Sequence, residues 1–199
     1  MTASGDTNVN GIHRSCWSPI MASVFDVASY FVHLSYSAGE PEAITTLKLQ
    51  KLLYYAQALS LTKRGTSLFS DKIKAWSDGP VVPVIWHKYQ QKRTVPSNDH
   101  KADLAVDDRV FLRQIWKLYG KYSGDELSRM THEEAPWKNA RGKLSPSAQS
   151  DAEITLASMR EFFAGQRIEL PDVPRPIEIR RGREVYRIED AGEVLPVRI

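Results

Sequence analysis

Histidine and cysteine often perform chemistry or bind metals in proteins, but this chain has few of them, and they lack the spacing of a metal or catalytic site. The five histidines form no His-x-x-x-His pair: His13, His33, His87, His100 and His132. A single cysteine, Cys16, cannot build a thiolate zinc site or an internal disulfide. We therefore expect neither a metal nor another cofactor.

The residues after His132 come nearest to a catalytic motif. His132 is followed by Glu133 and Glu134, as at the start of a metalloprotease helix, but Pro136 stands where the second histidine is required. Together with Thr131 and Trp137, these residues instead predict a buried polar corner. In that corner the His132 ring would donate to a backbone carbonyl, with the Trp137 ring packed behind it.

Two other acidic motifs also lack the arrangement that catalysis needs. Asp107 and Asp108 are adjacent, and neighbours on a helix point apart, so they cannot share a proton. The turn Asp78-Gly79-Pro80 has neither the glycine spacing nor the lysine of a phosphate-binding loop. The sequence predicts a protein without enzyme activity, and a hydrolase using His132 with an acidic partner remains the weaker alternative.

The strongest structural pattern is a helix that begins at Thr45 or Thr46, either of which can cap it. Leucine and alanine recur at helical spacing and form one apolar stripe: Leu49, Leu52, Leu53, Ala56 and Leu59. Gly65 can close this helix in a left-handed conformation. The other face carries donors and aromatic rings, and it predicts either a binding surface or a solvated face: Lys48, Gln50, Lys51, Tyr54 and Tyr55.

An extended segment follows this central helix. Residues Lys72–Trp76 alternate in polarity and predict a short strand, after which Gly79 can turn the chain. Pro83 suits the first turn of a helix running from Val84 to about Gln91. Large apolar side chains are needed to fill a core, so we expect tryptophans there: Trp76, Trp86 and Trp116.

Four further helices are predicted, which makes the fold mainly α, with about six helices, a small β element and a C-terminal arm. They span residues 22–38, 106–122, 123–132 and about 150–165. Ser123 and Ser150 each stand three residues before a glutamate, the spacing of a capping box. The residue before Pro136 is pushed out of helical geometry, so the third of these helices should end there.

Composition indicates one compact globular domain for residues 21–169 of the 199-residue chain. A lone cysteine suits the cytoplasm. Residues 1–20 lack the apolar run of a signal peptide, and we expect a disordered arm. The net charge of +3 and pI near 8.9 come from scattered basic residues. They leave a nucleic-acid-binding regulator open as an alternative, favoured mainly by Lys48 and Lys51.

Residues 170–199 differ in composition, with three prolines at the start and then an apolar alternation around Gly182. This arm predicts a hairpin or an extended segment. Two alternatives remain open at this stage. The arm either pairs with the chain's own strand at Lys72–Trp76, or adds a strand to a partner protein and sets specificity.

Three blocks, in order, resemble the Panacea domain of SocA-like antitoxins: "KLQKLLYYAQA" from Lys48, "AWSDGPVVPVIWHKY" from Ala75, and "LSRMTHEEAPW" from Leu127. The resemblance covers about residues 22–165. It implies a cytoplasmic antitoxin of a toxin–antitoxin module, a class associated with phage defence. Such a protein would neutralise its toxin by direct contact, or deliver it to a Clp-type protease as an adaptor.

That resemblance also suggests which residues matter, and no membrane partner is expected. Contacts with a toxin encoded by a neighbouring gene are predicted for Lys48, Gln50, Lys51, Tyr55, Trp76, Asp78, Gly79 and Pro80. Tyr186 is added to this set because of the apolar alternation of the arm, which lies beyond the resemblance. A structural motif is predicted for Thr131, His132, Pro136 and Trp137.

Overall fold

A computed structural model describes residues 21–38, 44–90, 92, 94–96, 102–145, 147–175, 177–181, 184–188 and 194–197, the last three ranges by their backbone. The helices in these residues are α1 (Val24–Ser37), α2 (Thr46–Leu59), α3 (Pro83–Tyr89), α4 (Val106–Tyr119), α5 (Gly124–Glu133), α6 (Ala135–Arg141) and α7 (Leu156–Ala164). The strands are β1 (Ile73–Trp76), β2 (Gly79–Val81), β3 (Glu153–Ile154), β4 (Ile177–Arg181), β5 (Glu184–Ile188) and β6 (Val194–Val197).

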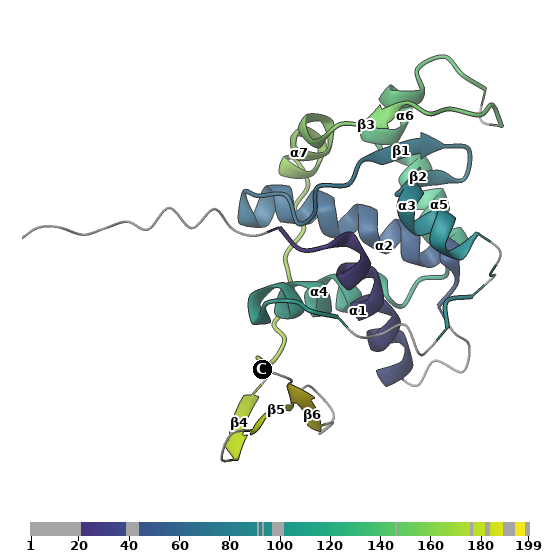
Figure 1. Cartoon of the computed structure of the whole chain (residues 1–199). Coiled ribbons are helices and arrows are strands. Elements are labelled where there is room, and N and C mark those ends of the chain that lie inside the picture. Colours follow the sequence, from purple (N-terminus) through teal and green to yellow (C-terminus); the bar gives the residue numbers. More distant parts are fainter. Residues whose placement is uncertain are drawn as a thin grey trace, which may run out of the picture.

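Helix α2 runs through the middle of the molecule (Figure 1). The Thr45 side chain caps its start by accepting from the Lys48 amide at 3.1 Å. A π-helical turn, Ser60–Arg64, continues it, and Gly65 ends it at φ +75°, as the sequence predicted. Helices α1, α3, α4, α5 and α7 and strand β2 all pack against α2. Because of this enclosure, every residue from Lys48 to Leu59 is buried.

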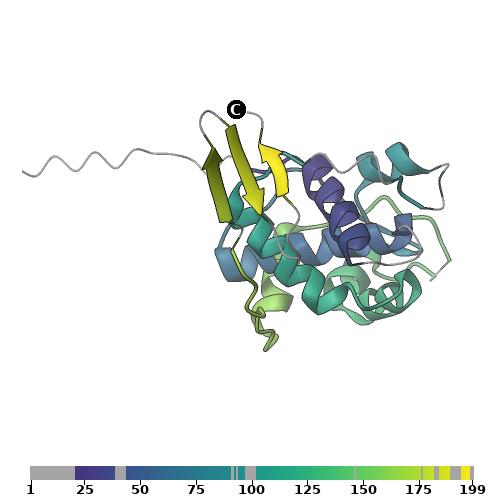
Figure 2. The same cartoon turned by 90° about the horizontal axis from the view of Figure 1, so that it is seen from below.

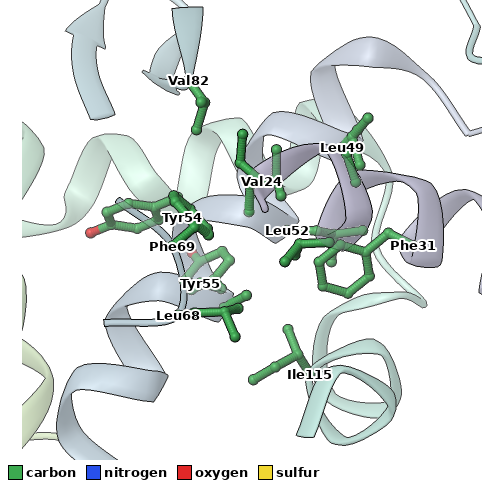
Figure 3. Close-up of a cluster of buried hydrophobic side chains, with 14 of the residues drawn as sticks. Val24, Phe31, Leu49, Leu52, Tyr54, Tyr55, Leu68, Phe69, Val82 and Ile115 are labelled. Carbon is green, nitrogen blue, oxygen red and sulfur yellow. The ribbon is translucent and has the colours of Figure 1, made fainter. Parts of the chain in front are cut away.

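The core forms where α2 meets its neighbours (Figure 3). Leu49 and Leu52 of α2 pack with Phe31 of α1 and Ile115 of α4. The Gln57 side chain lies in this interior and binds the segment after the π-helical turn. Its amide donates to the Phe69 carbonyl at 2.9 Å, and its oxygen accepts from the Leu68 amide at 2.9 Å.

A small antiparallel sheet lies over one end of α2, with the strand order β2-β1-β3. Strand β3 corrects the expectation that a capping box at Ser150 opens the last helix. Residues 153–154 pair with β1 instead, and α7 begins later, with Thr155 as its cap. The sheet also identifies the partners of the predicted strand: β1 pairs with β2 on one edge and β3 on the other, and none of the described residues of the C-terminal arm pairs with it.

The break between α5 and α6 lies at Glu134, which has extended backbone geometry. Ser123 and Glu126 form the predicted capping box at the start of α5. Pro136 ends α5 as expected, but it also occupies the first turn of α6, a helix that the sequence analysis did not anticipate. The described residues therefore contain seven α-helices around one core, and the mainly α prediction is confirmed.

The C-terminal arm begins with an extended strap, residues 170–175, that lies along α4. Three side chains of α4 donate to carbonyls of the strap: Gln114 to Pro171 at 2.9 Å, Lys117 to Asp172 at 3.2 Å, and Arg113 to Pro174. Arg175 then pairs with Asp107 at 2.9 Å. Strands β4, β5 and β6 follow as an antiparallel sheet in that order (Figure 2), which confirms the predicted hairpin around residue 182.

In the part of the chain that the structure describes, no helix is long and apolar enough to cross a membrane. The predicted N-terminal arm, with Cys16 and Trp17, lies outside the described residues.

Candidate functional site

The turn between β1 and β2 is held from inside the molecule by α2 and α5. The Lys51 Nζ donates to the Pro80 carbonyl at 3.1 Å. Gln50 makes two bonds to Val82: its oxygen accepts from the amide at 2.7 Å, and its nitrogen donates to the carbonyl at 3.4 Å. The Ser128 hydroxyl of α5 donates to the Asp78 carbonyl at 2.8 Å. Side chains far away in the sequence therefore determine the position of this turn.

Gly79 lies at the tightest point of the turn, with φ +103°. A Cβ atom there would lie 2.8 Å from both Cε and Nζ of Lys51 and 2.9 Å from Oγ1 of Thr131. Real Cβ atoms essentially never show such distances. The close contact explains why a glycine is needed, since both the backbone angle and the space exclude a side chain.

The predicted polar corner at His132 is present. The His132 and Trp137 rings lie 4.2 Å apart, and His132 hydrogen-bonds to the Ser77 backbone. The indole of Trp137 donates to the Trp76 carbonyl at 2.9 Å. Burial and the nearby Lys51 charge lower the pKa of His132. The corner ties the α5–α6 break to strand β1.

Within the described chain, the His132 Nε2 atom is buried and has no hydrogen-bond partner. Beside the corner, Arg141 fastens the loop after α6: it donates to the Ala75 carbonyl at 3.0 Å and to the Ser145 carbonyl at 2.7 Å. The guanidinium of Arg141 also lies over the Trp137 ring. These contacts connect the corner to β1 and to the loop after α6.

A half-buried cluster, in which one carboxylate binds two tyrosine hydroxyls, lies at the same helix break. The Glu134 carboxylate accepts from the Tyr54 hydroxyl at 2.7 Å and from the Tyr55 hydroxyl at 2.9 Å. The Tyr55 ring stacks on Tyr119 at 4.0 Å. Burial raises the pKa of Glu134 to about 7, although the two tyrosine hydrogen bonds act in the opposite direction. Burial and the Glu134 charge raise the pKa values of both tyrosines.

Lys51 is the second unusual ionisable group, since its side chain is fully buried. Burial lowers its pKa to about 7, and the charge of Asp78 only partly opposes that shift. Sequence analysis missed Glu134 as a buried group and placed Lys51 at the surface. Helical periodicity could not have shown either, because neither residue lies in an apolar stripe.

The expectation of an outward, polar face on α2 is wrong. Five side chains assigned to that face are buried: Lys48, Gln50, Lys51, Tyr54 and Tyr55. Elements pack around the whole helix, so its polar face meets β2, α4 and α5 instead of solvent. Lys48, for example, lies over the Trp116 ring. Gly79 and Pro80 are buried as well, and the Tyr186 side chain lies outside the described structure.

Two of the predicted contact residues remain at the surface, Trp76 and Asp78. The Trp76 ring packs edge to face against Trp86 of α3 at 5.2 Å, and Trp86 in turn contacts the ring of the exposed His87. We call these four residues the tryptophan surface: Trp76, Asp78, Trp86 and His87. The expectation of a tryptophan core is wrong, because Trp76, Trp86 and Trp116 are each only half-buried at the edge of the core.

Groups of histidine, cysteine and acidic residues that could hold a metal ion are absent from the described residues. A family model does match the chain: the antitoxin SocA-like Panacea domain, over residues 49–138. Residues 49–138, a little under half of the chain, are therefore similar to the SocA-like Panacea domain, and we call this part of the chain the Panacea domain. The match runs from α2 to α6 and so includes the clamped turn, the polar corner and the Glu134 cluster of the Panacea domain.

No curated protein matches the chain, and no solved structure matches it. The family match alone, over residues 49–138, supports an antitoxin-type function.

We expect the substitution Gly79→Ala to destabilise the Panacea domain by about 2–4 kcal/mol, because it combines a left-handed backbone with overpacking. Gly65→Ala is the matched control. It has a similar backbone requirement, at φ +75°, but nothing within 4 Å of the added atom. The control should lose only about 1 kcal/mol. Urea denaturation measures both, and equal losses would contradict the crowding by Lys51 and Thr131.

The two buried groups predict that stability has a minimum near neutral pH. Between pH 4.5 and 7, Glu134 stays protonated in the folded protein while the unfolded chain ionises, so stability falls by about 3 kcal/mol as pH rises. Between pH 7 and 10.5, Lys51 is neutral when folded and charged when unfolded. Stability therefore rises with pH across this range, by about 4–5 kcal/mol.

Two substitutions separate these effects in urea denaturation series at different pH values. Glu134→Gln keeps hydrogen-bonding oxygen but cannot ionise, so the fall below pH 7 should disappear. Lys51→Met keeps the length of the side chain without its amine, so the rise above pH 7 should disappear. A pH dependence identical to that of the wild type in both variants would exclude these two groups as its source.

Proposed function

We propose that this chain is an antitoxin that neutralises a cognate protein toxin by binding it directly through the tryptophan surface. The Panacea domain supports the antitoxin class. The observation that carries the direct-binding proposal is the pair of half-exposed tryptophans, Trp76 and Trp86, beside an exposed Asp78. Aromatic residues are enriched at interfaces, where tryptophan often contributes most of the binding energy.

The tryptophan surface is also rigid, which lowers the entropy cost of binding. Trp76 is held through its carbonyl by Trp137, and the turn beyond it is held by Lys51 and Ser128. On this proposal, the buried polar residues of α2 act indirectly. They place the turn and its aromatic neighbours without touching the toxin.

The nucleic-acid-binding alternative loses its main support in the structure. Lys48 and Lys51, the two lysines that favoured it, are buried and contact the chain's own Trp116 ring and Pro80 carbonyl. A buried ammonium group cannot release counterions from a phosphate backbone. A protein toxin is therefore the partner that we propose, in the cytoplasm.

Neutralisation by occlusion and delivery to a Clp-type protease both begin with the same toxin contact. Toxin inhibition measured with purified proteins distinguishes these two mechanisms. Full inhibition of the toxin by the antitoxin alone supports occlusion, whereas inhibition that needs an added Clp-type protease supports the adaptor role.

The tryptophan surface predicts that Trp86→Ala weakens toxin binding by at least about thirtyfold, the loss of a strong interface residue. The measurement is calorimetric titration with the product of the neighbouring gene. Leu156→Ala on α7 is the control, because Leu156 is also an exposed apolar residue, 44% accessible, but lies outside this surface. Binding that is equally tight in both variants would contradict the proposed surface.

We further propose that residues 21–169 are a common docking domain and that residues 170–199 help to choose the toxin. The structure suggests a better truncation point than residue 170, because the strap is bonded to α4. A chain ending at Arg175 should keep the melting temperature of the full protein and lose affinity for its toxin.

A second chain, ending at Leu170, should lose affinity for the toxin and, unlike the first, should melt at a lower temperature than the full protein. It lacks the carbonyls that Arg113, Gln114 and Lys117 bind. Retained toxin affinity in the chain ending at Arg175 would exclude the arm from recognition while leaving the tryptophan surface untouched.

A further inference from the structure

We propose that this protein self-associates through the free edge of β4, where strands from two copies pair antiparallel and join the two C-terminal sheets into one. The proposal needs no toxin and is independent of the antitoxin assignment. It rests on the strand order of the sheet and on the sequence of β4.

The strand order β4-β5-β6 leaves two edges in the described part of this sheet (Figure 2). The edge of β6 contains Pro196, which pairs with Tyr186 and has no backbone N–H. The edge of β4 has no proline between Ile177 and Arg181, so the alternate residues whose backbone groups point away from β5 can both donate and accept. An edge of this kind is a template for another strand.

Strand β4 is also held near the helical domain before any partner arrives. It begins directly after the strap, whose carbonyls are bound by Gln114 and Lys117 and whose Arg175 pairs with Asp107. The strap therefore ties the chain to α4 as far as Arg175, two residues before β4 begins, which limits how far the sheet can move from the helical domain and reduces the entropy cost of strand addition.

The register between two copies follows from the alternation of hydrogen bonds along a strand. Directly opposed residues must both be bonding or both be non-bonding positions, so the twofold axis must pass through a residue and not between two residues. With the axis at Ile179, all five residues are paired. Glu178 of each copy then lies opposite Arg180 of the other.

The neighbouring registers pair fewer residues and place like charges opposite each other. With the axis at Glu178, only three residues overlap and glutamate faces glutamate; with the axis at Arg180, arginine faces arginine. Opposite charges directly across an antiparallel pair attract, and like charges repel. The sequence of β4 is thus complementary to a second copy of itself, as a symmetric interface requires.

Five residues per copy are fewer than the roughly 20–30 per side of a stable complex, so association should be weak and depend on concentration. Sedimentation velocity of the full chain, from about 1 μM to about 0.5 mM, should show a monomer–dimer equilibrium. Arg180→Glu and Glu178→Arg should each raise the self-dissociation constant by at least about tenfold.

An equimolar mixture of the two charge-reversed variants is the decisive sample, because it places opposite charges together again at both positions. We expect it to recover wild-type association as a heterodimer, which a loss of folding could not produce. Arg167→Glu, which reverses an exposed charge outside β4, is the control and should not change association.

Cross-linking tests the register itself in a chain in which Cys16 is replaced by serine. Cysteine at position 179 would oppose its own copy and should form an intermolecular disulfide. Cysteine at position 177 would lie about 13 Å from its copy along the strand, too far for a disulfide. A wild-type monomer at all concentrations, a mixture that fails to associate, or cross-linking at 177 instead of 179 would overturn the proposal.

Discussion

The complete burial of α2 is the constraint on which the rest of this structure depends. A polar group in a protein interior is costly unless it is hydrogen-bonded, and α2 carries several of them. Gln50, Lys51 and Gln57 meet this requirement by binding the backbone of other segments. The helix therefore organises the chain through polar contacts as well as through its leucines.

This arrangement connects the interior to the surface. Lys51 and Gln50 position the β1–β2 turn and the segment after it, and Ser128 holds the turn from α5. The turn displays Asp78, while β1 and α3 display Trp76 and Trp86. A partner that binds the tryptophan surface would touch none of the polar residues of α2, yet it would depend on them for the shape it recognises.

Two ionisable groups buried against α2 also explain why shifted pKa values need not indicate catalysis. Glu134 accepts from two tyrosine hydroxyls, and Lys51 donates to a backbone carbonyl, so each is occupied by a structural contact. Perturbed pKa values are common in active sites, but buried structural networks produce them too. In this protein we expect both groups to make folding depend on pH without taking part in any reaction.

The sequence by itself determined most of the local elements and several of their ends. The cap at Thr45, the left-handed Gly65 and the capping box at Ser123 were predicted correctly, because each depends on residues close together in the chain. The three motif blocks likewise identified the Panacea domain. Patterns of this kind can be read from the sequence because the residues that interact are near neighbours in the chain.

Only the tertiary structure decided which surfaces are buried and which remain exposed. Periodicity assigned the polar face of α2 to solvent, but packing on all sides turned it inward and left the tryptophans half-exposed. Strand β3 and the strap form through pairing with β1 and α4, segments far away in sequence. The pairing of Glu134 with Tyr54 joins residues 80 positions apart, and no local pattern records a contact at that separation.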